Sequence, residues 1–485
     1  MANLYKQVAS ASKWSTIAEI SSRAITPVSL ILLARVLTPE DYGVVSVATI
    51  VVSFTQMISD LGFQNALIQK DYDEKKLSRA ASVGFLANMF VAIILYVLIF
   101  VLAEPLSLLF GIPESVMVIR IMAIQIILNS LNSIQTGLIQ RALNFKILFY
   151  IRLTTTLIPA LVSIPLAYTG ISYWALVAGA LFGSLANTVV VWIRSPWKPR
   201  LFWKLELFKE MIGFSLFNMA ETFALWLAAW ADQIVVGAVM TTSALGLYRT
   251  STNLVNVLVN LLLSAILPVL FSTLSRLQSD EAAFRSFFQN ANKIICMIAF
   301  PLGIGFLFFG ETVAAIVFGS KWNGAGDIIR IWGFVSAISL VYGVNGIGYR
   351  AKGKPQLNVI VICTNMCILL PAIIISAPYG LLTFVAVRSV VKLLQAPVNF
   401  YYGKKYLAIS FVQTIQNLRW IFAASGLMAA GYFVYVWLIP YDTMMAQIVG
   451  ALFCCVFYFI GLIPERTFIR KTINLFLGRN QSAES

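Results

Sequence analysis

Residues 37–45 read LTPEDYGVV, and residues 240–248, which lie 203 positions later, read MTTSALGLY. A second match follows at a slightly larger offset: LLFGIPESVMVIRIMAI at 108–124 corresponds to IVFGSKWNGAGDIIRIWGF at 316–334. The chain therefore contains an internal repeat. We assign six membrane spans to each copy. Because six is an even number, both copies enter the membrane from the same side, which predicts two parallel six-helix lobes.

The composition places the chain in a membrane. Of its 485 residues, 59% are hydrophobic and only 11% are charged, which excludes an ordinary soluble protein. The apolar runs are continuous over about 20 residues rather than alternating over about 10, which predicts an all-α polytopic protein. We predict fourteen spans, near 12–35, 42–68, 78–103, 115–139, 147–168, 171–193, 208–231, 244–274, 284–309, 327–349, 356–377, 380–402, 417–439 and 443–463.

The repeat and the spans give a domain division. We predict an N-lobe at 1–200 with six helices, a C-lobe at 201–410 with six more, and a last part at 411–485. That last part holds helices 13 and 14 and a cytoplasmic tail. No small-residue cleavage site follows the first long segment, so we expect this segment to stay as a helix.

The positive charges predict the orientation. Of the 35 lysines and arginines, 27 fall on one alternating set of loops and their adjoining helix ends, whereas the opposite loops carry only Lys321. The positive-inside rule then places both termini in the cytoplasm. The net charge of +15 reflects this topology and contacts with anionic membrane lipids, so we expect no nucleic-acid partner.

Charged side chains inside the spans are candidates for function, because charges at membrane depth are costly and face polar interiors. Glu19 and Arg23 are four residues apart on one helix face and can partly neutralise each other. Arg388 and Lys392 have the same spacing but like charge, which favours water or an anionic ligand. The basic residues in or at the outer ends of the spans are Arg23, Arg35, Arg120, Arg249, Arg330, Arg388 and Lys392. Arg120 and Arg330 lie near helix ends, where snorkelling to the interface explains them.

Neutral polar residues form a second group of candidates. Asn253, Asn256 and Asn260 recur at i, i+3 and i+7 and form one polar stripe on a predicted helix. Such a stripe binds sugar or hydrogen-bonds a neighbouring helix, and the pattern leaves both readings open. Further candidates for contacts with sugar are Gln56, Asn218, Trp226 and Trp230.

Any ion coupling must use carboxylates, because the chain contains no histidine. The acids at membrane depth are Glu19, Glu221 and, at a helix end, Asp232. Glu221 has no basic neighbour one turn away, so it is the preferred proton-coupling candidate over the ion-paired Glu19. The alternative role for Glu221 is a hydrogen-bonded lining of a cavity.

Several enzyme classes lack their signatures here. No P-loop sequence is present, so we expect no nucleotide hydrolysis. The five cysteines lie in apolar runs without histidine or neighbouring carboxylates, which favours buried packing over a metal site. The predicted loops are too short for a catalytic domain. We therefore expect neither an enzyme nor a cofactor.

The entry into the first helices resembles a known family. ASKWSTIAEISSRAITPVSLILLARVLTPEDYGVVSVA at 11–48 and DLGFQNALIQK at 60–70 are similar to the start of bacterial Wzx-type polysaccharide flippases. VFGSKWNGAG at 317–326 resembles the corresponding loop of the colanic-acid exporter branch. These flippases belong to the multidrug/oligosaccharidyl-lipid/polysaccharide superfamily, whose fold of two six-helix lobes agrees with the internal repeat.

The resemblance implies a transporter of the bacterial inner membrane that moves undecaprenyl-pyrophosphate-linked oligosaccharide by alternating access. It also implies a cationic cavity, coupling to a proton or sodium gradient, and work beside a polysaccharide polymerase and a chain-length regulator. Arginine suits pyrophosphate because its planar fork donates two parallel hydrogen bonds. Our substrate-binding candidates are Arg23, Arg249, Arg388, Lys392, Asn253, Asn256 and Asn260. The alternatives are a flippase for a cell-wall precursor, a drug or cation antiporter, and a non-transporting scaffold for envelope assembly.

Overall fold

The computed structural model describes residues 25–59, 62–439 and 443–476, and these residues form helices joined by short turns, without a strand. An apolar helix, Ile25–Val36, comes first. The helices that follow it, up to the middle of the chain, are α2 (Pro39–Ser59), α3 (Phe63–Gln69), α4 (Glu74–Leu109), α5 (Ser115–Met122), α6 (Ile124–Arg141), α7 (Phe145–Tyr168), α8 (Trp174–Arg194) and α9 (Leu205–Val239). The remaining helices are α10 (Thr242–Arg276), α11 (Glu281–Val317), α12 (Ala325–Gly343), α13 (Asn345–Ala351), α14 (Gln356–Ser376), η1 (Ala377–Tyr379), α15 (Leu381–Leu393), α16 (Gln395–Leu407), α17 (Phe411–Leu438), α18 (Met444–Gly461), η2 (Ile463–Glu465) and α19 (Arg466–Phe476).

The all-α polytopic fold predicted from the sequence is confirmed. Among the described residues, twelve helices are long and apolar enough to cross a membrane, and α10 raises the number to 13 if its two parts, bent by 45°, count as one span. The predicted span 12–35 begins outside the described residues and continues into the helix Ile25–Val36. The total of fourteen spans therefore stays a prediction.

The chain divides into two compact units. Unit 1 contains residues up to 257 together with 317–322 and 362–384, and unit 2 contains 258–316, 323–361 and 385–485. Short segments from the second half of the sequence thus belong to unit 1. The lobe boundaries at 200 and 410, which rest on the repeat, stay a prediction.

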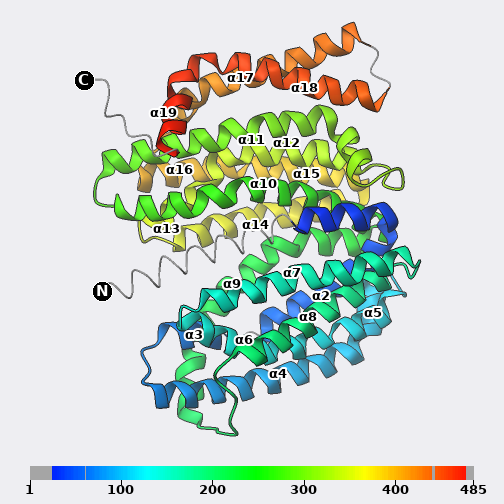
Figure 1. The fold of residues 1–485 in the computed structure, drawn as a ribbon, viewed down its shortest axis with the longest axis vertical. Coiled ribbons are helices and arrows are strands. Elements are labelled where there is room, and N and C mark those ends of the chain that lie inside the picture. The colour runs from blue at the N-terminus through cyan, green and yellow to red at the C-terminus, as the bar shows by residue number, and fades with distance from the viewer. Residues whose placement is uncertain (1–24, 60–61, 440–442, 477–485) are drawn as a thin grey trace. The chain divides into compact units, whose positions relative to one another are not determined.

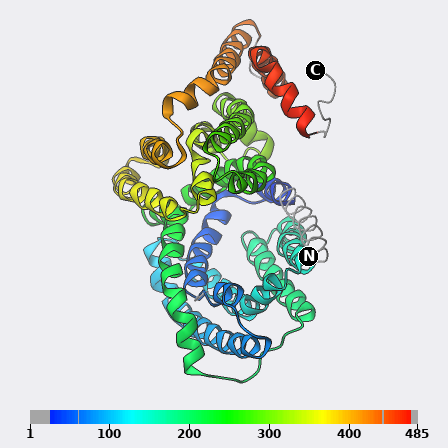
Figure 2. The same ribbon diagram turned by 90° about the vertical axis from the view of Figure 1, so that its left-hand side faces the viewer.

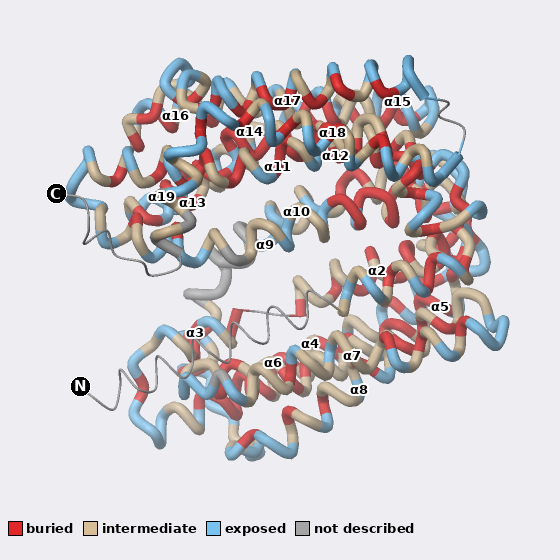
Figure 3. Tube along the Cα trace, turned by 45° about the horizontal axis from the view of Figure 1, so that its top comes forward, coloured by how far each residue is buried: buried red, intermediate tan, exposed pale blue. Residues whose placement is uncertain are grey.

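Exposed and buried residues alternate along the described helices, as Figure 3 shows. On α4, Phe90, Val97 and Val101 are exposed, whereas Asn88 and Ala92 on the other face are buried. A helix satisfies its own backbone hydrogen bonds, which is why apolar runs of this length fold as helices in lipid. The cysteines of α14 correct one expectation: Cys363 and Cys367 lie on an exposed face and not in the core.

Close helix pairs form where small residues remove side-chain bulk. In unit 1, α7 and α8 run side by side (Figures 1 and 2). Gly179 and Gly183 of α8 face Ser163 and Pro159 of α7 so closely that a β-carbon at either glycine would lie within 3.0 Å of them. Small residues allow such approach between membrane helices. In unit 2, α17 and α18 form the corresponding close pair near the C-terminal end.

The two repeated stretches contact each other reciprocally. A β-carbon on Gly43, near the start of α2, would lie within 3.0 Å of the Thr242 carbonyl oxygen. A β-carbon on Gly246, near the start of α10, would lie equally close to the carbonyl oxygen of Pro39. Residues 39 and 43 are the repeat equivalents of 242 and 246. In each copy, the glycine therefore contacts the first residue of the other copy's helix, α10 or α2. The reciprocity of these two contacts supports the alignment of the two stretches.

The segment 317–322 caps the C-terminal end of the helix Ile25–Val36. The buried Trp322 donates its indole N–H to the carbonyl oxygen of Ala34 at 2.8 Å, and Lys321 donates to that of Val36 at 2.7 Å. The last carbonyls of a helix have no partner within the helix and carry a partial negative charge. Both donors therefore satisfy and stabilise this helix end. Lys321 is the single basic residue of the opposite loops in our sequence analysis, and this contact gives it a structural role.

Candidate functional site

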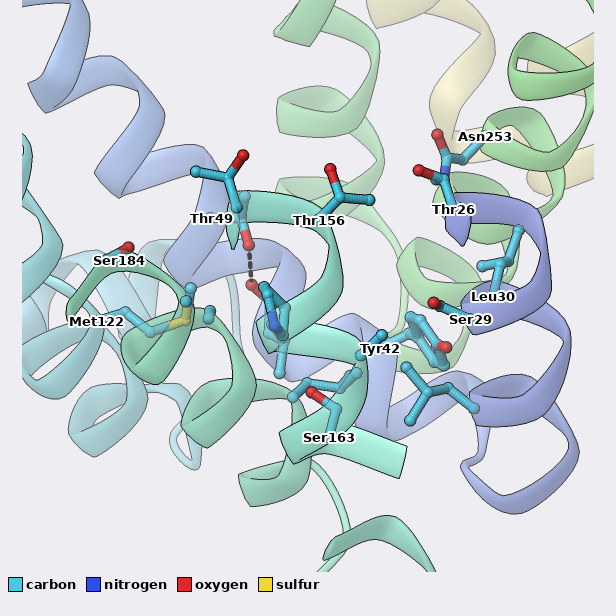
Figure 4. Close-up of a pocket in the computed structure, with 18 of the residues that line it drawn as sticks. Thr26, Ser29, Leu30, Tyr42, Thr49, Met122, Thr156, Ser163, Ser184 and Asn253 are labelled. Carbon is cyan, nitrogen blue, oxygen red and sulfur yellow. Dashed lines mark hydrogen bonds between the residues drawn. The ribbon is translucent and has the colours of Figure 1, made fainter. Parts of the chain in front are cut away.

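A cavity of about 590 Å³ lies within unit 1. Figure 4 shows side chains from several helices pointing into it: Thr26 and Ser29 from the first helix, Thr49 from α2, Ser163 from α7, and Asn253 from α10. α5, α6 and α8 complete the wall. Its size is in the range of cavities that hold small organic ligands.

The wall of this cavity is polar and carries one kind of charge. Of the described residues that line the cavity, Arg249 is the one with a charged side chain, and none is a carboxylate. Most other polar groups are hydroxyls and amides. They come from Thr26, Ser29, Tyr42, Ser46, Thr49, Gln125, Asn129, Thr155, Thr156, Ser163, Ser184, Asn187, Thr250 and Asn253.

Arg249 is held by an aromatic ring. Its guanidinium carbon lies 5.4 Å from the centroid of the Trp230 ring on α9, and within the described part of the chain Arg249 makes no ion pair. The negative face of an aromatic ring attracts and stabilises a guanidinium that lies over it. Its N–H groups lie in the plane of the guanidinium, so they stay available for a planar, bidentate acceptor such as a phosphate.

Several polar groups around Arg249 have hydrogen-bonding capacity to spare. Within the described part of the chain, the Tyr42 hydroxyl, the Gln125 amide nitrogen, the Asn187 carbonyl oxygen and the Thr250 hydroxyl are buried without a hydrogen-bond partner. Buried polar groups are normally paired, with protein or with solvent and ligand in a cavity. These groups line the cavity wall, so it can both donate and accept hydrogen bonds.

Asp41, which precedes Tyr42 of this wall, joins two elements of unit 1. Its carboxylate accepts hydrogen bonds from the backbone N–H and the hydroxyl of Thr38 at 2.9 and 3.0 Å, which caps the start of α2. It also accepts from the Ser172 hydroxyl and from the backbone N–H of Tyr173 at 3.1 Å. One side chain thus joins α2 to the turn between α7 and α8. Tyr42 follows it directly and packs edge-on against Trp322 at 5.4 Å.

The structure brings only part of the predicted asparagine stripe to the cavity. Asn253 lines it, whereas Asn256 and Asn260 are exposed residues farther along α10 and are absent from its wall. Of the two tryptophans predicted to contact sugar, Trp230 supports Arg249, and Trp226 donates its indole N–H to Ser53 on α2 at 3.1 Å.

Arg388 and Lys392 lie together in unit 2, around one tryptophan. The Arg388 guanidinium carbon is 4.0 Å from the ring centroid of Trp332, and the Lys392 ammonium is 4.1 Å from it. Lys392 also donates to the Ser336 hydroxyl at 3.0 Å. The ring offsets part of the repulsion between two like charges one helical turn apart. The sequence pattern did not indicate Trp332.

Of the three predicted carboxylates, the described residues include the side chain of Asp232. Asp232 on α9 is buried and accepts hydrogen bonds from the Tyr248 hydroxyl at 2.5 Å and from the backbone N–H of Gln233 at 2.8 Å. Glu221 belongs to α9, but its side chain lies outside the described residues, as do Glu19 and Arg23 altogether. The roles given to these three residues stay predictions.

The polar face of α6 was not predicted from the sequence. Gln125 and Asn129 line the cavity, and the same helix carries further amides and hydroxyls within the stretch NSLNSIQT at 129–136. Six residues of that kind in about two turns of an apolar helix are the signal that could have indicated this face. Polar residues in a membrane span are informative because each needs a partner away from lipid.

Comparison with known proteins agrees with this architecture. The family model described as "Polysaccharide biosynthesis protein" matches residues 32–327. The succinoglycan biosynthesis transport protein ExoT of Rhizobium meliloti is 26% identical over 66% of this chain and 64% of its own length. The teichuronic acid biosynthesis protein TuaB of Bacillus subtilis is 25% identical over 89% of this chain and 90% of its own. The match to ExoT thus spans slightly less than two thirds of that protein.

The fold also matches a solved structure. The lipid II flippase MurJ in an inward closed conformation superimposes with a TM-score of 0.76 at 14% identity, covering 94% of this chain and 99% of MurJ. At this identity the likeness shows the fold alone. The sequence match carries the family, and the predicted resemblance to bacterial polysaccharide biosynthesis proteins is confirmed. This chain is a multi-pass membrane protein that belongs to the polysaccharide biosynthesis protein family.

Proposed function

We propose that this protein flips undecaprenyl-pyrophosphate-linked oligosaccharide units from the cytoplasmic to the outer leaflet of a bacterial inner membrane, by alternating access. At a coarser level, relatives named for polysaccharide biosynthesis and transport already support a non-enzymatic transport role. The lipid carrier and the direction of movement are the parts that we add.

The cavity around Arg249 is the observation that carries the proposal. A pyrophosphate and a hydroxyl-rich sugar cannot cross hydrocarbon unaided, because they would lose their hydrogen bonds to water. Among the described residues that line the cavity, Arg249 supplies the charge and the hydroxyls and amides supply the remaining donors and acceptors. A carrier of organic cations would need carboxylates in that place, so the wall favours an anionic, sugar-bearing substrate.

Arg388 and Lys392 extend the same proposal to unit 2. They present two cations at one tryptophan ring, and we assign them to the anionic part of the substrate as well. The predicted Arg23 joins this group. Asn253, Asn256 and Asn260 then remain the candidates for sugar hydroxyls on α10.

The charge distribution supports the proposed orientation, with both termini in the cytoplasm. In that orientation the basic loops face anionic lipid on the cytoplasmic side. A polysaccharide polymerase and a chain-length regulator are the partners that we propose on the outer side, because they use the delivered units.

Reconstitution tests the proposed activity directly. We expect proteoliposomes that contain the purified protein to expose a fluorescent undecaprenyl-pyrophosphate-linked oligosaccharide fully to an external quencher. Protein-free liposomes should expose only the lipid of the outer leaflet. A fluorescent organic cation serves as the probe for the antiporter alternative. Accumulation of that cation without movement of the lipid would overturn the proposal, and movement of neither probe would favour a scaffold.

Glu221 is the residue that we propose for ion coupling. Glu221→Gln keeps the shape of the side chain but removes its titration, so transport should lose its response to an imposed pH gradient. The matched control is Glu206→Gln on the same helix, whose carboxylate is exposed and pairs with Lys204 at 2.7 Å. Transport rates with and without a pH gradient give the readout. An unchanged response in Glu221→Gln would remove this residue from the coupling mechanism.

A further inference from the structure

Unit 1 contains a second cavity, of about 360 Å³. It lies among α2, α3, α4 and α6, and α4 and α6 run side by side in Figure 1. Six of its ten lining residues come from α6, at positions 126, 129, 130, 132, 133 and 136. This spacing corresponds to one face of a helix. The polar face of α6 therefore lines a second cavity.

The chemistry of this second cavity differs from that around Arg249. Nine of its ten lining residues have uncharged polar side chains, and Ile126 is the tenth. None of the ten carries a charge, so neither a phosphate nor a metal cation would find a counter-charge on this wall. The nine polar residues are Gln56, Ser59, Gln64, Asn88, Asn129, Ser130, Asn132, Ser133 and Thr136.

Several of these side chains are deeply buried and have spare hydrogen-bonding capacity. Asn88 is 1% exposed, and both polar atoms of its amide lack a hydrogen-bond partner among the described residues. The hydroxyl of Ser130, 4% exposed, lacks one too. Asn132 uses its amide nitrogen on the Thr188 hydroxyl at 2.9 Å, which leaves its carbonyl oxygen without a partner. Burial of such groups without partners is costly, so the wall calls for a ligand or solvent that both donates and accepts hydrogen bonds.

We propose that this second cavity binds an uncharged sugar ring of the lipid-linked oligosaccharide. A sugar hydroxyl donates and accepts at once, which matches amide and hydroxyl walls. At about 360 Å³ the cavity is far larger than the roughly 10–15 Å³ that one structural water needs. Asn129 lines both cavities, so the two adjoin within unit 1. The Arg249 cavity then takes the pyrophosphate and the amide-lined cavity takes a neutral sugar, an assignment that rests on the proposed function.

Asn88→Leu tests the assignment, because leucine keeps nearly the same shape and removes both polar atoms. The two probes are undecaprenyl pyrophosphate alone and the same lipid carrying a neutral hexose, with binding to the purified full-length protein measured by native mass spectrometry. We expect wild type to bind the glycosylated lipid more tightly. Asn88→Leu should weaken that binding about tenfold, to the level of the bare lipid, and leave binding of the bare lipid unchanged.

Gln135→Leu is the matched control. Gln135 is also a fully buried amide on α6 without a hydrogen-bond partner among the described residues, but it is not part of either cavity wall. It should leave both affinities unchanged. Unaltered binding of the glycosylated lipid by Asn88→Leu, or an equal loss for both lipids, would overturn the sugar site and identify a solvent-filled packing cavity. If wild type binds neither lipid, the proposed function itself fails and this assignment falls with it.

Discussion

Gly246→Ala is expected to lower the amount of folded protein in the membrane several-fold and its melting temperature in detergent by several degrees. The added β-carbon would meet the backbone carbonyl of Pro39, which cannot rotate away as the end of a flexible side chain can. Overpacking of this kind costs about 1–3 kcal/mol or more. Gly43→Ala should have a similar effect through the Thr242 carbonyl.

Gly305→Ala provides the matched control. Gly305 lies inside α11, and a β-carbon there meets nothing within 4 Å. Alanine should therefore be neutral or stabilise this helix by up to about 1 kcal/mol. Because Gly43 and Gly246 serve one contact, the double variant should be less harmful than the sum of the two single effects. Additive effects would show that the two glycines act independently, and a Gly246→Ala protein as stable as wild type would show that the two repeats do not need this approach.

The repeat at LTPEDYGVV and MTTSALGLY predicted the kind of fold, because long apolar runs permit little other than helices in lipid. It did not predict that Gly43 and Gly246 meet. A sequence match shows that two segments are equivalent, whereas their contact depends on how the chain brings the two helix starts together. The close approach of carbonyl oxygens explains why both positions are glycine.

Prediction of the site was only partly possible for a related reason. Arg249 and Asn253 could be selected because charge and amides in an apolar span are rare. Trp230 and Trp332 could not be assigned to particular cations, since each pairing joins two different helices, α9 with α10 and α12 with α15. The amides of α6 were overlooked because uncharged residues stand out less than charged ones against an apolar background, although their number in two turns was the signal.

Arg249→Ala should reduce flipping of the labelled lipid-linked oligosaccharide by about 10- to 100-fold, with normal protein levels. Hydrogen bonds to a charged group contribute about 1.5–3 kcal/mol, and Arg249 is the charged residue among the described residues of its cavity wall. Loss of the side chain leaves Trp230 and the neutral groups in place, so the fold should persist. Initial flipping rates in proteoliposomes with equal protein content give the measurement.

Arg249→Lys separates charge from geometry. Lysine keeps the charge but replaces the planar fork with a point charge, so we expect it to recover part of the rate and to stay clearly below wild type. Arg120→Ala is the control for loss of an arginine near the membrane boundary. Arg120 donates to the backbone carbonyl of Phe100 at 3.2 Å, and its guanidinium carbon lies 4.9 Å from the centroid of the Phe100 ring. That variant should flip lipid at nearly the wild-type rate. Full activity in Arg249→Ala would exclude this arginine as the pyrophosphate ligand. Equal losses of flipping in Arg249→Ala and Arg120→Ala would show that any lost positive charge lowers the rate, without a specific contact at Arg249.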